Sequence, residues 1–581
     1  MSVAQTHEEI VGAFVKSNPD FFATARRVKS LTPLMFAAML GLTEWVRAMV
    51  KYAVDLDAVD DDGNTALSHA VLKKNSECVR VLLDAGAGLG RSHETGISLL
   101  IAAAHGGSSK CVRALLERGA IIDAVDRCGA TALMWASRAG HVGCVRVLLE
   151  AGARVLPRDV RGNSALEYAA AGGSADCVRA LLEAGASLDG VNNGDETALM
   201  VASVAGKVQC VRALLEFKPK INARDAIGYT ALHLAVRGGN RNIGCVHVLL
   251  KAGAKVDLAT KFGETALITA AESEELDCVR ALIKSGANPN VADGLGWTAL
   301  MVLTLQGHSE CVSELLIVNA DPNIASKDDS RTSLIIAASA GRDECLTTLL
   351  DAGAHIHATD EQGRNALMYA ARDGSARCVQ VLLRRGAKAD LNCSGGWTAV
   401  AFAASNGRAE CLRILLEAGA NPEAKMSPNM TPLMFAAHQK HGECVRLLVE
   451  ANAKVDEFDE RRITVLMWAC LQGCVVAVRA LLERNANVDA VDWRGWTALT
   501  SAVAGRSAEC IRAMLETKAD IDCRDNDGMT PLMMAADRGI TVGVRMLLSA
   551  GASRDLECKK GMDAVRYAAR RGHDDCVRLL R

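Results

Sequence analysis

Short apolar blocks recur along the chain at an almost constant spacing, and turn residues separate them. Each copy contains a triplet such as "TAL" or "TPL", whose first residue recurs every 33 residues from Thr32 to Asp563, with steps of 35 after Thr230 and 34 after Thr298. This gives 17 copies, which cover nearly all of the 581 residues. A fixed period of this length is typical of repeat proteins, in which each unit packs mainly on its neighbours.

Each copy predicts a turn followed by two short antiparallel helices. The turn has the pattern Asp-x-x-Gly, as at 60–63 and 525–528, because Asp bonds its own backbone and Gly adopts positive φ. The Thr that follows is a good helix N-cap, and Pro33, Pro432 and Pro531 stand directly after it, where a first-turn proline is favoured. The first helix runs through "LMxAA" and the second through "CVRxLLExGA", whose Gly ends it.

These copies resemble the ankyrin repeat, and the residues that carry the resemblance are "TPLMFAA" at 32–38 and "TALHLAV" at 230–236. The resemblance implies an all-α ankyrin-repeat solenoid, built from helix–turn–helix repeats with β-hairpin-like finger loops. It implies an array of about 17 repeats over residues 31–581, the last one truncated. We expect residues 1–30 to form a helical cap or degenerate half-repeat, since Thr6 and Glu9 make a capping-box pattern.

The chain departs from the family pattern at one position. The family usually has His after "TPL", but here only His233 keeps it, and Met stands there in eight copies, such as Met35 and Met134. Met is flexible and polarizable. We therefore expect Met to fill this position by packing.

A cysteine lies 13 residues after the triplet in 14 of the 17 copies, with Cys245 shifted by a local insertion. Equivalent positions in neighbouring repeats are about 10 Å apart, one helix diameter, whereas a disulfide needs about 4.4–6.8 Å between Cα atoms. We therefore expect buried free thiols that act as small apolar side chains, and no disulfide or metal site. Cys470 and Cys474 form the one close pair, but they lack further ligands at zinc spacing.

An Arg follows two residues after the cysteine position in 13 copies, which alone would suggest a phosphate-binding stripe. An acid stands four residues later in several copies. We therefore expect i,i+4 ion pairs on a solvated outer face, each contributing about 0.2–0.5 kcal/mol. The expected pairs are Arg113–Glu117, Arg146–Glu150, Arg179–Glu183, Arg413–Glu417 and Arg479–Glu483.

Net charge, hydrophobicity and the absence of known motifs reduce the number of function classes to consider. The net charge is −2, from 66 basic and 68 acidic residues, so nothing global favours nucleic acid or an anionic membrane. No apolar run reaches the roughly 18 residues of a membrane span, and the N-terminus lacks the features of a signal peptide. We expect a cytoplasmic protein, with the nucleus as the other candidate compartment. Nucleotide-binding, metalloprotease, hydrolase and kinase motifs are absent, so we expect no enzyme, cofactor or metal.

The family resemblance implies a non-catalytic protein–protein interaction scaffold or adaptor that acts as a monomer and binds a protein partner on the concave face of fingers and inner helices. The alternative is a substrate-receptor or regulatory subunit of an enzyme complex such as a ubiquitin ligase. In the family the contacting positions are the finger tips, the residue before the Thr and the end of the first helix. The candidate partner-binding residues at tips and before the Thr are Tyr229, Phe262, Trp297, Arg331, Arg364, Trp397, Trp493 and Trp496.

Trp, Tyr and Arg are the residues enriched in binding hot spots, which favours this interpretation. The alternative is that these side chains only pack one finger against the next. The sequence does not decide between these two interpretations. Two insertions, in "RGGNRNIG" and "ASKDDSR", also fall in the middle of the chain, and insertions in repeat arrays often lie on the binding face. We expect Trp45, Trp135 and Trp468 to be core residues.

Overall fold

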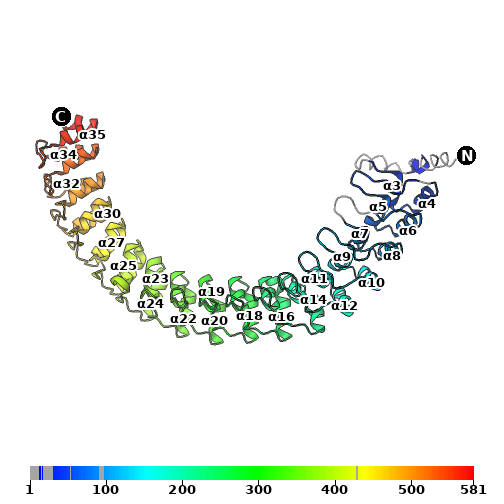
Figure 1. The fold of residues 1–581 in the computed structure, drawn as a ribbon. Coiled ribbons are helices and arrows are strands. Elements are labelled where there is room, and N and C mark those ends of the chain that lie inside the picture. Colours follow the sequence, from blue (N-terminus) through cyan, green and yellow to red (C-terminus); the bar gives the residue numbers. More distant parts are fainter. Residues whose placement is uncertain are drawn as a thin grey trace. The chain divides into compact units, whose positions relative to one another are not determined.

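The computed structural model describes residues 9, 12–14, 16–17, 30–52, 54–89, 97–426 and 429–581. The chain divides into two compact units, Met1–Gly294 (unit 1) and Leu295–Arg581 (unit 2). In each unit, pairs of short helices are stacked in chain order (Figure 1). The described residues contain seventeen pairs, as the sequence period predicts.

Unit 1 contains eight of these pairs, in which the odd-numbered helix comes first. Its helices are α3 (Pro33–Leu40), α4 (Thr43–Val50), α5 (Ala66–Leu72), α6 (Ser76–Asp84), α7 (Leu99–Gly106), α8 (Ser109–Glu117), α9 (Ala132–Arg138), α10 (Val142–Glu150), α11 (Ala165–Gly172), α12 (Ala175–Glu183), α13 (Ala198–Val204), α14 (Val208–Glu216), α15 (Ala231–Arg237), the 3₁₀ turn η1 (Asn240–Asn242), α16 (Ile243–Lys251), α17 (Ala266–Glu272) and α18 (Leu276–Lys284).

Unit 2 contains the other nine pairs, again with the odd-numbered helix first. Its helices are α19 (Ala299–Gln306), α20 (Ser309–Ile317), α21 (Ser333–Ser339), α22 (Asp343–Asp351), α23 (Ala366–Asp373), α24 (Ala376–Arg384), the 3₁₀ turn η2 (Ser394–Gly396), α25 (Ala399–Ser405), α26 (Ala409–Glu417), α27 (Pro432–His438), α28 (Gly442–Glu450), α29 (Val465–Leu471), α30 (Val475–Glu483), α31 (Ala498–Ala504), α32 (Ala508–Leu515), α33 (Pro531–Asp537), α34 (Thr541–Ser549), α35 (Ala564–Arg571) and α36 (Asp574–Leu580).

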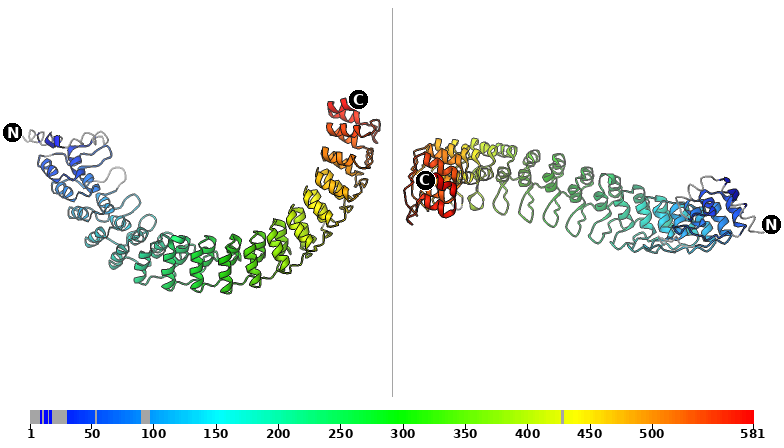
Figure 2. Two further views of the ribbon diagram at one scale, coloured as in Figure 1. Left: turned by 180° about the vertical axis from the view of Figure 1, so that it is seen from behind. Right: turned by 90° about the horizontal axis from the view of Figure 1, so that it is seen from above.

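A finger loop precedes the first helix in the repeats where this segment is described, and in unit 2 the fingers project as separate loops from one side of the stack (Figure 2). Isolated antiparallel bridges close several of them, such as Val125 with Thr131 and Phe458 with Thr464. Within a finger, one carboxylate oxygen of the leading Asp shapes the turn. Asp126 Oδ1, for example, accepts from the backbone N–H groups of Cys128 and Ala130 at 2.8 and 2.9 Å. The β-hairpin-like fingers are thus present, and Asp does what its turn propensity predicts.

The N-cap Thr of the first helix acts as predicted, but the Met three residues later does more than pack. Thr131 Oγ1 accepts from the backbone N–H of Met134 at 3.3 Å, and Met134 Sδ accepts from the backbone N–H of Thr131 at 3.4 Å. Met35, Met200 and Met467 make the same sulfur contact. The thioether therefore replaces the acceptor that His supplies at His233, whose Nδ1 accepts from the N–H of Thr230 at 3.3 Å.

The repeated cysteines lie in the core, as predicted. All fourteen are buried in the second helices, and none forms a disulfide. In α12, Cys177 is buried together with Val178, Ala180 and Leu181. Burial raises the pKa of the Cys144 thiol to about 11, with smaller contributions from neighbouring thiols. The Cys144 thiol therefore stays protonated at neutral pH and packs as an apolar group.

The predicted ion pairs on the second helices are mostly wrong in detail. Of the five, only Arg413–Glu417 forms, at 2.5 Å. Arg179 instead bonds Glu216 of the next repeat at 2.9 Å, and Arg113 reaches Glu150 of the next repeat at 3.4 Å. An Arg placed N-terminal to its Glu is the less favourable i,i+4 orientation. The long side chain can instead reach the neighbouring helix.

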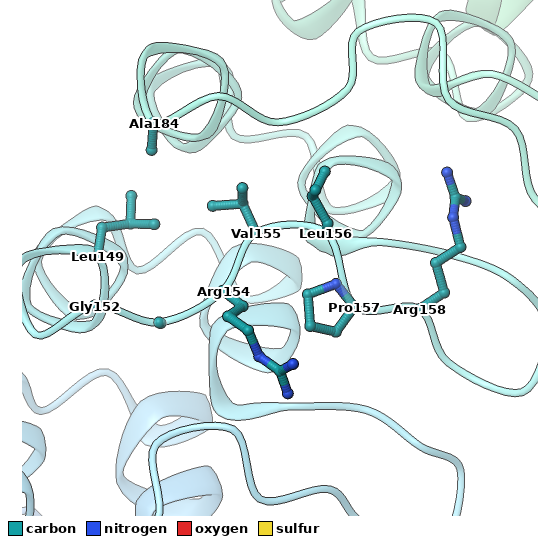
Figure 3. A pocket seen from close by; sticks show the side chains of 9 residues that line it. Leu149, Gly152, Arg154, Val155, Leu156, Pro157, Arg158 and Ala184 are labelled. Carbon is teal, nitrogen blue, oxygen red and sulfur yellow. The ribbon is translucent and has the colours of Figure 1, made fainter.

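Polar side chains also join successive repeats. Asp123 Oδ1 accepts from the backbone N–H of Arg154 at 3.2 Å, and Asp189 does the same for Lys220 at 2.8 Å. At the equivalent place between these two stands Leu156, which has no acceptor and is 63% exposed. A hollow opens there, and in Figure 3 Leu149, Val155 and Ala184 lie around it while Arg154 points to the other side.

The expected cap at residues 1–30 falls mostly outside the described residues. Among those that are described, Phe14 is fully buried. Its ring packs edge-on against Phe36 and Trp45 of the first helix pair, with centroid distances of 6.1 and 5.3 Å.

Candidate binding surface

A row of aromatic or histidine side chains follows the first helices, four residues after the N-cap; we call it the ring row. Its members in unit 1 are Phe36, His69, Trp135 and Tyr168, and those in unit 2 are Tyr369, Phe402, Phe435, Trp468 and Tyr567. Trp135 and Trp468 were expected to be core residues. Both are half-buried, as is Trp45 outside the row, whereas Phe36, Tyr369 and Tyr567 of the row are buried.

Four members of the ring row are tied to a finger Asp by their polar tip. Tyr567 instead contacts Cys558 Sγ at 3.3 Å, and Trp468 Nε1 makes no hydrogen bond although Asp459 stands nine residues before it. Trp135 Nε1 donates to Asp126 Oδ2 at 2.8 Å, the oxygen that the finger backbone leaves free. The same bond joins His69 to Asp60, Tyr168 to Asp159 and Tyr369 to Asp360, at 2.8–2.9 Å. We call these four the locked rings. The spacing is visible in the sequence as an Asp nine residues before a His, Trp or Tyr. Only the structure shows that two side chains at this separation come within hydrogen-bond distance.

Phe402 and Phe435 have no polar tip, and the matching finger residues are Cys393 and Met426. The predicted site residue Trp397 lies against both rings, with centroid distances of 5.0 and 4.8 Å. All three side chains are half-buried, and they belong to two adjacent repeats. We call Trp397, Phe402 and Phe435 the open rings.

The structure brings the predicted residues Arg331 and Arg364 together around Tyr369. Their guanidinium carbons lie 5.3 and 4.9 Å from the Tyr369 ring centroid, and that of Arg372 lies 4.5 Å away. Each arginine also pairs with its own carboxylate, on Asp329, Asp360 and Asp373.

The Asp360 carboxylate shows how this cluster is held. Burial acts to raise its pKa, but the hydrogen bonds from the Arg364 backbone and the Tyr369 hydroxyl outweigh burial and lower it. The carboxylate therefore stays charged and fixes both the finger and the ring.

Trp493 and Trp496 are brought together through an arginine. The guanidinium carbon of Arg494 lies 3.8 Å from the Trp496 ring and 5.3 Å from the Trp493 ring. Arg538, at the end of α33, approaches the Trp496 ring to 5.6 Å. Trp493 is 57% exposed.

The remaining predicted residues do not join these clusters. In unit 1, the Tyr229 hydroxyl donates to Glu264 in the next repeat at 3.1 Å, and Arg237 lies over its ring at 5.4 Å. Phe262 is 63% exposed on its finger. In unit 2, Trp297 is half-buried just before its N-cap Thr298.

The two insertions occupy different places. The first forms η1 between α15 and α16, where the buried Asn242 side chain donates to the carbonyls of Ser203 and Val204 at 3.0 and 2.9 Å. This insertion therefore connects two neighbouring repeats at a place that is not part of the fingers. The second lies in a finger, where Ser326 donates to Asp329 at 2.6 Å beside Arg331.

The ring row has a gap in unit 1, where Ala102 stands between His69 and Trp135. A hollow of about 520 Å³ opens at this place, lined by Leu72, Ile101, Ala102, His105 and Trp135 among others. Over the described parts of the chain, no group of three His, Cys, Asp or Glu side chains is arranged to hold a metal ion. None of the helices described here has the length and apolar character to cross a membrane.

Stacked helix pairs with projecting fingers define a helical repeat solenoid, and comparison with known families identifies which one. The family model "Ankyrin repeats (3 copies)" matches residues 1–93, 85–159, 155–225, 218–293, 289–360, 334–426, 424–492, 477–557 and 518–581. The chain therefore belongs to the ankyrin-repeat family. Ankyrin repeats are in general protein–protein interaction modules, and proteins built from them are typically non-catalytic binding scaffolds.

Among solved structures, the chain is similar to the human ASB11 ankyrin repeat domain. The sequence identity is 28% and the TM-score 0.36, and the match covers 38% of this chain and 99% of that domain. No curated protein matches the chain.

Proposed function

We propose that this protein is a binding scaffold without catalysis of its own, and that a protein partner binds the finger and first-helix face of unit 2. The open rings carry this proposal. Trp397, Phe402 and Phe435 place three half-exposed aromatic side chains side by side on adjacent repeats, and neither Phe has a finger Asp to hold it.

Aromatic side chains in this arrangement suit a hot spot. They bury much apolar area for little loss of rotamer freedom, and a helical scaffold holds them in place before binding. Arg331, Arg364, Trp493 and Trp496 lie on fingers of the same unit and supply further contacts in this proposal. In unit 1 we assign Tyr229 to finger packing, because its hydroxyl bonds Glu264 of the next repeat.

The test compares the partners captured from cell extract by the intact chain and by the variant Trp397→Ala/Phe435→Ala. We expect the variant to lose the specific partners, with affinity reduced about 30-fold or more, because hot-spot truncations cost 2 kcal/mol or more. The matched control is Phe217→Ala, which removes a partly exposed ring at the end of α14 in unit 1.

Circular dichroism should show the same helicity for all three proteins. Retention of every partner by the double variant, or an equal loss in the Phe217→Ala control, would contradict the proposal.

A further inference from the structure

A second surface of unit 2 lies on two successive fingers and on the end of α33. Trp493 on one finger donates its backbone N–H to the carbonyl of Arg461 on the previous finger at 3.1 Å, so the two fingers lie side by side. We call Arg461, Arg462, Trp493, Arg494, Trp496 and Arg538 the basic aromatic face.

Three arginines of this face have no acidic partner in the described part of the chain. Arg461 and Arg462 are exposed at a finger tip, and no carboxylate lies within ion-pair distance of them or of Arg538. On the second helices of the same unit, by contrast, Arg413 and Arg446 are each held by two Glu side chains. Arg461, Arg462 and Arg538 thus keep the positive charge that is neutralised at Arg413 and Arg446.

The arginines near the tryptophans are fixed in place. The guanidinium carbon of Arg494 lies 3.8 Å from the Trp496 ring centroid, and Arg494 pairs with the buried Asp492 at 3.2 Å. Arg538 donates to the carbonyl of Ala504 at 2.9 Å. Burial lowers the pKa of Arg538, the nearby Arg506 and Arg494 act in the same direction, and Asp537 partly opposes them.

This arrangement favours carboxylates with an apolar neighbour. A guanidinium held on an aromatic ring keeps its N–H edge directed outward, in the geometry that binds a carboxylate. The exposed Trp493 ring offers apolar contact beside it. Arg494 and Arg538 lie over the Trp496 ring, so this ring offers no free face on which a nucleobase could stack.

We propose that the basic aromatic face binds an extended acidic segment of a partner protein, with carboxylates at Arg461, Arg462 and Arg538 and an apolar side chain on Trp493. The inference rests on the proposed function, because it names the chemistry of a second contact on the same binding unit. It adds a prediction that the open rings do not make, namely a charge requirement on the partner.

The experiment selects peptides from a random-sequence display library on the full chain and measures their affinity by fluorescence anisotropy. We expect peptides rich in Asp and Glu with an apolar residue among them. Their affinity should fall about tenfold or more for Arg461→Glu/Arg462→Glu, because a repulsion between carboxylates replaces each attraction between arginine and carboxylate. It should also fall with added salt.

The matched control is Arg127→Glu/Arg161→Glu, which makes the same charge change on exposed finger arginines of unit 1. Equal loss in both double variants, or recovery of neutral and basic peptides, would overturn the inference. Peptides that depend on Trp397 but not on Arg461 and Arg462 would leave the proposed function standing and overturn the acidic partner.

A labelled single-stranded oligonucleotide provides the last comparison. Tight binding of the oligonucleotide that is lost in Arg461→Glu/Arg462→Glu would assign the face to nucleic acid instead. Recovery of no binding peptides at all would count against both proposals.

Discussion

The rings on α9 and α11 in unit 1 and those on α25 and α27 in unit 2 occupy the same helix position, yet they differ in what holds them. Trp135 and Tyr168 each donate a polar hydrogen to a finger Asp. Phe402 and Phe435 have no such atom and contact Trp397 instead. The first pair connects finger to helix within its own repeat, whereas the rings of the second pair contact Trp397 and stay half-exposed.

The difference follows from two residues nine positions apart. An Asp in the finger uses one oxygen for the turn, and its second oxygen needs a donor when it is partly buried. In the locked rings a Trp, Tyr or His on the helix satisfies it, whereas Phe cannot. At Trp468 the indole N–H makes no such bond although Asp459 stands at the same spacing, so a polar tip is necessary for the bond but does not by itself produce it.

Truncation of a locked ring should have the largest effect on stability. We expect Trp135→Ala to reduce the free energy of unfolding of its region by about 3 kcal/mol, because it removes both ring burial and the bond to Asp126. Phe402→Ala should cost about 1.5 kcal/mol, since only part of the ring is buried. Hydrogen exchange of the amides in α9 and α25 measures both. Equal losses would remove the distinction between locked and open rings.

Acid should destabilise the repeat that contains His233, the buried His that ties its helix to the next finger. Burial lowers the pKa of His233 to about 4, against 6.5 for a free His. Between pH 6.5 and pH 4, His233 binds a proton in the unfolded chain but not in the folded chain. The free energy of unfolding therefore falls as the pH falls through this range. The loss should reach about 3 kcal/mol at pH 4.

The matched variant is His233→Met, which places there the residue found in eight other repeats. Its stability at neutral pH should be close to that of the natural chain, and the extra acid sensitivity should disappear. Urea unfolding at several pH values measures the difference. Parallel pH curves for the two proteins would show that His233 does not titrate as its burial implies.

An open ring can be converted into a locked one. The double variant Cys393→Asp/Phe402→Tyr recreates the pair formed by Asp360 and Tyr369 in the preceding repeat. We expect a favourable coupling of about 1 kcal/mol between the two changes in a double-mutant cycle, because neither change alone supplies both donor and acceptor. Additive single effects would show that the finger cannot bring residue 393 to the helix.

The smallest effect is expected from restoring the hydrogen bond between repeats that is missing at Leu156. Leu156→Asp supplies the acceptor that Asp123 and Asp189 provide in the neighbouring repeats, and the amide of Ser187 is its expected donor. We expect a gain of about 0.5–1 kcal/mol in thermal unfolding. Asp123→Leu is the reciprocal control and should lose a similar amount. A loss in both would mean that Pro157 holds this loop in another conformation.

Much of the fold could be predicted from the sequence because it depends on local patterns. The period, the N-cap Thr, the Asp turns and the buried cysteines each involve a few neighbouring residues, and all were found as expected. The Met sulfur acceptors and the salt bridge from Arg179 to Glu216 were not expected. Both depend on how far a flexible side chain reaches, which periodicity does not contain.

The candidate site was predicted only in part. The residue before the N-cap pointed to Trp397, but Phe402 and Phe435 came from the helix position that was assigned to the core. Arg494 lies over the Trp496 ring within the same finger, and Arg538 joins the tryptophan cluster because the next repeat brings it over that ring.

The sequence by itself determined the repeat, its register and its buried positions, because each repeat restates the same local chemistry and a period of 33 residues aligns the copies. The tertiary structure decided which rings are locked by a finger carboxylate, which rings remain open and which arginines lack a partner. These outcomes depend on distances between side chains of different elements and adjacent repeats, and such distances exist only after the helices have packed.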